Sequence, residues 1–64
     1  MSLQPVHSSA IAAVGYDGST LAVRFRGSGR IYLHHRVPES VYAGLVTASS
    51  IGAYYNRHIR RRYP

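Results

Sequence analysis

The sequence predicts an α+β domain in which a three-stranded antiparallel β-meander is followed by two short α-helices packed on one face (β-β-β-α-α). Three observations support this order. Apolar and polar residues alternate in residues 21–26, as in a strand with one buried face. Turn-forming sequences, Asp17-Gly18 and residues 27–29, flank that run. After Pro38 the apolar spacing changes to that of a helix.

The length of 64 residues predicts one small domain. Residues 1–7 lack periodicity and are expected to form a flexible N-terminal arm, with a single domain over residues 8–64. The absence of Cys fits a reducing compartment, and we predict a cytoplasmic location. The longest apolar run, residues 10–14, is far shorter than the ~20 residues that span a bilayer, so no membrane span is expected.

Three strands are expected, at residues 10–16, 21–26 and 30–37. Asp17 lies in the first predicted turn, where it is favoured as a turn former rather than a catalytic acid. The third strand has two mixed faces. One carries Ile31, Leu33, His35 and Val37, and the other carries Arg30, Tyr32, His34 and Arg36. The residue pattern does not decide which face is buried.

The first helix is expected over residues 38–48, because Pro38 suits a first helical turn and Val41 and Leu45 lie four apart. Ser50 is expected to cap a second helix that runs toward the C-terminus. Gly52 in that helix is expected to allow a close contact with the first helix.

The charge balance is the strongest functional signal. The chain has eight Arg, no Lys, one Asp and one Glu, which gives a net charge of +6. A high genomic GC content would explain Arg in place of Lys, but not the shortage of acids. The charge therefore predicts an anionic partner, of which nucleic acid is the first candidate. Plain solvation of charged faces is the competing interpretation.

A set of short motifs spread over most of the chain resembles the KTSC domain family, named for the C-terminus of some lysyl-tRNA synthetases. The motifs are Ser8-Ser9-x-Ile11, Tyr16-Asp17, Leu21-x-Val23-x-Phe25, Gly29, Tyr32, Val37-Pro38, Val41-Tyr42, Leu45, Ala48-x-Ser50-x-Gly52, Tyr55-Asn56-x-x-Ile59 and Tyr63. The family also occurs as free-standing small bacterial and phage proteins.

The resemblance implies a family of unknown function for which RNA binding has been suggested. Its usual mark is a central Tyr-x-Tyr. Here Tyr32 fills the first position and His34 the second, so any role that needs two phenols does not carry over. The resemblance also implies that Tyr32 and His34 lie on the structurally demanding face, with Leu33 outward.

The sequence offers little for catalysis or metal binding, and no enzyme activity, catalytic residue, metal site or cofactor is expected. The only acids, Asp17 and Glu39, are predicted in a turn and at a helix start, not as a pair. His34 and His35 are adjacent in a strand and point to opposite faces, so they cannot chelate one ion together.

Nucleic-acid binding needs cations that contact phosphates and flat groups on which bases stack. Arg24 and Arg26 are expected on the outer face of the second strand. Helical spacing groups Arg57, Arg60 and Arg61 into one basic ridge. The predicted binding residues are Arg24, Arg26, Arg30, Arg36, Arg57, Arg60 and Arg61, with Tyr32, His34 and Tyr54 as stacking groups. RNA is favoured over DNA.

The alternative is a module for protein–protein interaction or self-association. If Tyr32 and His34 face the helices, Ile31 and Leu33 form an exposed apolar patch on the outer face of the third strand. The partner would then be another protein or a second copy of this chain.

Overall fold

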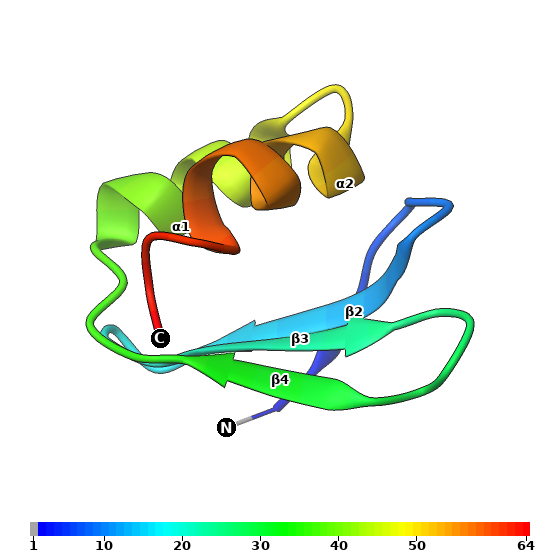
Figure 1. Ribbon diagram of the computed structural model, residues 1–64, viewed down its shortest axis with the longest axis horizontal. Helices are drawn as coiled ribbons and strands as arrows, with labels where there is room; N and C mark the ends of the chain where they lie inside the picture. Colours follow the sequence, from blue (N-terminus) through cyan, green and yellow to red (C-terminus); the bar gives the residue numbers. More distant parts are fainter. Residues whose placement is uncertain (1) are drawn as a thin grey trace.

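The computed structural model describes residues 2–64, which form one antiparallel sheet with all helices on one of its faces (Figure 1). The α+β class is confirmed, but the sheet has four strands and not three. Its order is β1-β2-β3-β4. The elements are β1 (Gln4–Pro5), β2 (Ile11–Tyr16), β3 (Leu21–Phe25), β4 (Ile31–His34), α1 (Glu39–Thr47), α2 (Ile51–Tyr54) and the π-helix η1 (Tyr55–Ile59).

The additional strand β1 lies within the segment expected to be an arm. Gln4 pairs with Val14, and Pro5 pairs with Ala13 of β2. The Val6 N–H then donates to the Ala12 carbonyl at 3.1 Å. A proline is tolerated here because β1 is the outermost strand of the sheet.

The β2–β3 hairpin turns at Asp17-Gly18, as predicted. Gly18 has a φ of +97°, a value that favours glycine. The Asp17 Oδ1 atom accepts hydrogen bonds from the backbone N–H groups of Thr20 and Ser19 at 2.7 and 3.0 Å. The bond from the Thr20 N–H, followed by that from the Ser19 N–H, lowers the pKa of the Asp17 carboxyl below its usual value. Asp17 therefore stabilises the turn.

The β3–β4 pairing decides which face of the third predicted strand is buried. His34 lies opposite Leu21 and is 6% exposed, whereas Leu33 lies opposite Ala22 and is 52% exposed. Tyr32 and His34 thus face the helical layer and Leu33 faces outward, as the family resemblance implied.

The strand β4 is shorter than predicted, ending at His34 and not at Val37. Arg36 has a φ of +58°, in the left-handed region, which breaks the extended backbone. The chain then turns inward, so that Val37 is buried and its N–H donates to the Ser19 carbonyl at 2.8 Å.

The helical segments begin close to the predicted positions. Pro38 is the N-cap residue of α1. The Ser50 hydroxyl accepts from the Ala53 N–H at 3.3 Å, so Ser50 caps α2 as predicted. The second helix differs from expectation after Tyr54, where it continues as π-helix with the Arg60 N–H donating to the Tyr55 carbonyl at 2.9 Å.

The close contact between the helices is made at Gly44 and not at Gly52. A Cβ atom on Gly44 would lie 2.7 Å from Cζ of Tyr54, so only glycine leaves room for that ring. At Gly52 the nearest atom is Cβ of Ala10, at 3.3 Å. The expected role of Gly52 is thus corrected: it brings α2 close to the β1–β2 connection.

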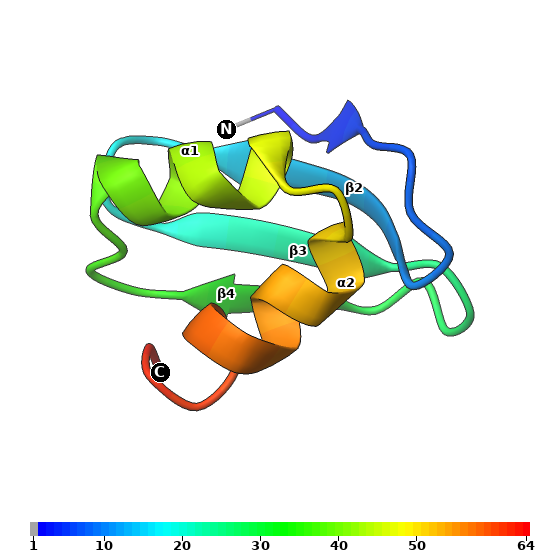
Figure 2. The same cartoon turned by 90° about the horizontal axis from the view of Figure 1, so that it is seen from above.

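The core lies between the sheet and the helices, which cross above β2, β3 and β4 (Figure 2). Its fully buried side chains are Ile11, Val14, Leu21, Val23, Val37, Leu45 and Ile59. Within residues 2–64, none of the helices has the length and apolar character needed to cross a bilayer.

Candidate nucleic-acid interface

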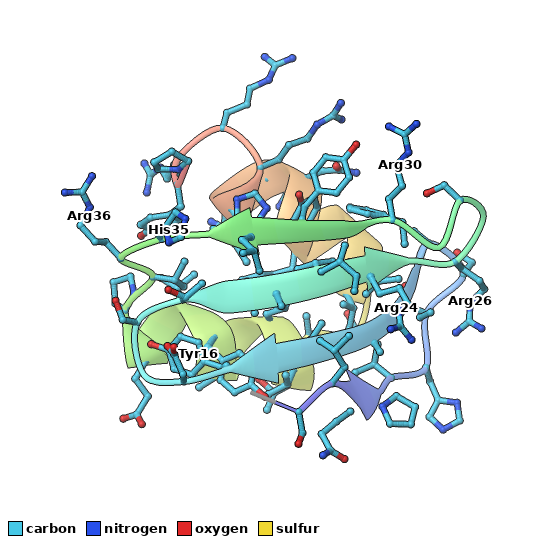
Figure 3. All side chains as sticks on the ribbon, turned by 90° about the horizontal axis from the view of Figure 1, so that it is seen from below. Tyr16, Arg24, Arg26, Arg30, His35 and Arg36 are labelled. Atoms are coloured by element: carbon cyan, nitrogen blue, oxygen red, sulfur yellow. The ribbon has the colours of Figure 1, made fainter. Side chains whose placement is uncertain are left out.

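Arg24 and Arg30 are exposed at the end of the sheet where β3 meets the β3–β4 turn (Figure 3). Arg24 pairs with Ala13 on one side and with Ile31 on the other. It therefore projects from the outer face among apolar neighbours, as predicted. Arg30 follows that turn, and its N–H donates to the Ser28 hydroxyl at 3.2 Å.

Arg26 has a structural environment that differs from the one predicted. Its Nε donates to the Ser8 carbonyl at 2.9 Å, and its Nη2 lies 3.3 Å from the Val6 carbonyl and 3.5 Å from that of Ile11. It follows β3 and connects this end of the sheet to the segment that enters β2. Because its Nε and Nη2 groups are hydrogen-bonded within the protein, Arg26 is less available than Arg24 to bind a phosphate.

His34 is buried and both of its ring nitrogens are engaged. Nδ1 lies 2.7 Å from the Tyr63 carbonyl oxygen, and Nε2 lies 2.8 Å from the Tyr55 hydroxyl. Because a carbonyl can only accept, Nδ1 carries a proton and donates to the Tyr63 carbonyl, while Nε2 and the Tyr55 hydroxyl share the second hydrogen bond. His34 therefore links β4, η1 and the C-terminal segment, and the expectation that it stacks on a base is corrected.

Tyr32 remains open to solvent, with 47% of its surface exposed. Its ring lies 5.3 Å from that of Phe25 in an edge-to-face arrangement, with an interplanar angle of 78°. Of the three predicted stacking groups, Tyr32 is the one that the fold presents as an accessible aromatic surface.

Tyr54 is half-buried between the helices. Its ring lies over Gly44 and is 4.5 Å from the His58 imidazole. This position explains why α1 carries a glycine at residue 44. Tyr54 thus serves packing first, and its ring is less available for stacking than the sequence suggested.

The predicted basic ridge assumed α-helical spacing, but Arg57 lies within a π-helix and Arg60 directly follows it. Arg57 lines a hollow of about 190 Å³ together with Tyr54 and His58. Arg60 lines a different cavity, described below, and Arg61 is exposed in the following turn. The three arginines share one end of the chain but do not form one ridge.

The cavity next to Arg60 has a volume of about 430 Å³ and lies between the β3–β4 hairpin and η1. We call it the aromatic cleft. Its lining residues are Phe25, Ser28, Tyr32, His34, Tyr55, Asn56 and Arg60. Sequence reasoning did not place Phe25, Ser28, Tyr55 or Asn56 at a site. Three of these belong to the motifs that resemble the family, but their spacing in the sequence does not show that they converge.

Electrostatically, the two acids lie at one end of the molecule. Burial raises the pKa of the Tyr16 hydroxyl, and the charges of Glu39 and Asp17 raise it further, so both carboxylates lie near this ring. In Figure 3 Tyr16 lies at the opposite end of the sheet from Arg24 and Arg30. Arg36 and His35 lie apart from those arginines, toward the end that holds Tyr16.

Metal-binding side chains do not cluster in the part of the chain that the structure describes: nowhere in residues 2–64 do three His, Cys, Asp or Glu residues come together as a potential metal site. The nitrogens of His34 are held by Tyr55 and Tyr63. Thr20 Oγ1 lies 3.4 Å from Nδ1 of His35.

Comparison with known proteins agrees with the motifs. The model of the KTSC domain matches residues 7–63. A protein from Tsukamurella paurometabola is 44% identical over 63 residues, which cover 95% of this chain and 92% of that protein. The crystal structure of a KTSC domain protein from Yersinia pestis has a TM-score of 0.91 and 32% identity, covering 98% of this chain and 90% of that one. The resemblance found in the sequence is thus confirmed, and the chain belongs to the KTSC domain family.

Proposed function

We propose that this domain is a non-enzymatic nucleic-acid-binding module with a preference for RNA. The observation that carries the proposal is the separation of charge. The net charge is +6, both acids lie near Tyr16 at the end of the sheet that also holds Arg36, Arg24 and Arg30 lie at the opposite end, and no acid lines the aromatic cleft beside Arg60. A surface of this kind attracts a polyanion and orients it away from the acidic end.

The binding surface that we propose combines the free arginines at two places. Arg24 and Arg30 lie at the end of the sheet, and Arg57, Arg60 and Arg61 lie on and after η1. Guanidinium groups suit this role because they pair with phosphate through two parallel hydrogen bonds.

The test is a titration with short single-stranded RNA at low salt, repeated at increasing salt. We expect affinity to fall as salt rises, because bound arginines release counterions from the RNA. The triple variant Arg57→Gln, Arg60→Gln and Arg61→Gln should bind more weakly, with a salt slope reduced by about one per lost phosphate contact. Failure to bind at low salt, or binding that does not respond to salt, would refute the proposal. Single-stranded and duplex DNA of the same sequence test the preference for RNA.

A second candidate function is supported by the outer face of the sheet. Ile31 and Leu33 are 48% and 52% exposed there, where Leu33 lies opposite the small Ala22 and Ile31 lies opposite Arg24. An exposed apolar pair of this kind fits a protein partner or a homodimer. Molar mass in solution, compared between the wild type and Leu33→Glu, tests self-association. A monomer in both cases would exclude the homodimer.

A further inference from the structure

The aromatic cleft has a shape and size suited to a small ligand. Its volume of about 430 Å³ lies within the range of small-molecule sites in proteins. Its wall combines residues from β3, the β3–β4 turn, β4 and η1, so the folded domain defines the cleft and no single element does.

The apolar part of the cleft is a connected set of rings. Phe25 lies edge-to-face with Tyr32 and also with Tyr55, at centroid distances of 5.3 and 5.4 Å. Tyr55 is buried and its hydroxyl is fixed by His34, whereas Tyr32 is half-exposed at the mouth. The inner rings are therefore held in place before any ligand binds, and the outer ring offers a surface on which a flat group can stack.

Apart from the buried His34, the polar side chains that line the cleft are exposed, and none of them is an acid. Asn56 brings an amide, which both donates and accepts, and Arg60 brings a guanidinium. The Ser28 oxygen accepts from the Arg30 N–H, which leaves the Ser28 O–H free to donate. The Arg60 charge lies close enough to Tyr55 to offset part of the burial effect that raises the pKa of that phenol. A cation thus lies next to the aromatic wall.

These features differ from those that other ligand classes require. A purely apolar ligand would gain nothing from Arg60 and Asn56, and a small inorganic anion would gain nothing from three rings. A flat heterocycle that carries a phosphate uses all of them, because it can stack, form hydrogen bonds along its edge and pair with a guanidinium.

We propose that the aromatic cleft binds one unstacked nucleotide, with its base against Tyr32, its edge facing Asn56 and its phosphate on Arg60. This inference rests on the proposed function, because it gives that surface a defined subsite. It implies that single-stranded nucleic acid binds in preference to a duplex, whose bases are not available for such a contact.

The experiment follows backbone and tyrosine ring resonances by NMR while three ligands are added separately. The ligands are a single-stranded RNA octamer, a duplex of the same sequence, and nucleoside 5′-monophosphates. The variants are Tyr32→Ala and Arg60→Gln. Arg62→Gln is the matched control, because it removes an equal charge from a nearby exposed residue that has no place in the proposed binding surface.

We expect the octamer to shift resonances of Tyr32, Tyr55 and Asn56, and the duplex to leave them unmoved. Tyr32→Ala should weaken octamer binding by about 5- to 150-fold, the usual loss for one stacked base, with an unchanged salt slope. Arg60→Gln should reduce the salt slope by about one and lower the response of the cleft to monophosphates. Arg62→Gln should preserve the response of the cleft.

The remaining outcomes separate the two proposals. If the octamer binds with salt dependence but leaves the cleft unmoved and Tyr32→Ala has no effect, the cleft proposal is overturned and the proposed function stands. If the octamer fails to bind but monophosphates shift the cleft in a saturable way, the cleft is a site for free nucleotides and the proposed function fails. If neither ligand binds, both proposals are refuted.

Discussion

The Tyr55 hydroxyl lies 2.8 Å from Nε2 of His34, inside the contact between β4 and η1. The second nitrogen of the same imidazole lies 2.7 Å from the Tyr63 carbonyl. One histidine thus connects a strand, a helix and the C-terminal segment, and it fixes the ring that forms the back of the aromatic cleft.

Tyr55→Phe should lower the free energy of unfolding by about 1–3 kcal/mol, because it leaves the buried Nε2 of His34 without its hydrogen-bond partner. Urea denaturation followed by circular dichroism measures this loss. Tyr42→Phe is the control, since it removes a hydroxyl from a half-buried ring that stacks on Tyr16 at 4.4 Å. Equal losses in both variants would contradict a specific role for the hydroxyl of Tyr55.

Gly44→Ala should lower the free energy of unfolding by about 1–3 kcal/mol, although alanine has the higher helix propensity, because its Cβ would collide with Tyr54. In a Tyr54→Ala background the same change should instead stabilise the protein by up to about 1 kcal/mol. This double-mutant cycle is read out by thermal or urea unfolding. Gly27→Ala, where the added Cβ meets no atom within 4 Å, is the control. A loss at Gly44 that persists without Tyr54 would be inconsistent with the collision.

Asp17→Asn should flatten the dependence of stability on acidic pH. Backbone hydrogen bonds lower the pKa of Asp17 in the folded state, so the unfolded chain binds this proton more readily. The ionised Asp17 therefore contributes its full stabilisation above about pH 4, the pKa of Asp in an unfolded chain. This contribution is lost as the pH falls through the lower pKa that Asp17 has in the folded protein.

Unfolding measured from pH 6 to pH 2 in both proteins checks this prediction. The difference between the two curves should shrink toward low pH. A constant difference would show that Asp17 stabilises the turn through something other than its charge.

Arg26→Gln and Arg24→Gln should separate a structural arginine from a binding one. Arg26→Gln removes hydrogen bonds to the Ser8 and Val6 carbonyls and should cost about 1 kcal/mol of stability. Arg24→Gln should leave stability within about 0.5 kcal/mol and reduce the salt slope of RNA binding. Chemical denaturation and RNA titration of both variants measure the two effects. If Arg24→Gln lowered the stability and Arg26→Gln did not, the hydrogen bonds of Arg26 would not contribute to stability as predicted.

Short-range patterns predicted most of the fold. The alternation around Val23, the Asp17-Gly18 turn and the Ser50 cap are local features, and each is present in the structure. The strand β1 escaped prediction because two residues, one of them Pro5, carry no periodicity. The π-helix escaped because Tyr55 and Ile59, four apart, also fit an α-helix.

The candidate site was less predictable, because it depends on long-range contacts. The bonds of His34 reach residues 21 and 29 positions away in the sequence. The roles of Arg26 and Tyr54 depend on a carbonyl 18 residues earlier and on a glycine of the other helix. Composition indicated the kind of partner, but only the assembled hairpin and helix reveal the aromatic cleft.

Two features limit the pairing of the sheet edges with other molecules. On one side the outermost strand is β1, where Pro5 has no N–H to offer to an incoming strand. On the other side the His35 N–H, just beyond β4, is already bonded to the Pro64 carbonyl at 2.8 Å. The β1 border and the end of the β4 border are therefore poor templates for edge-to-edge aggregation. Pairing of this domain with another strand is thus left to the open stretch of β4, next to the apolar residues Ile31 and Leu33.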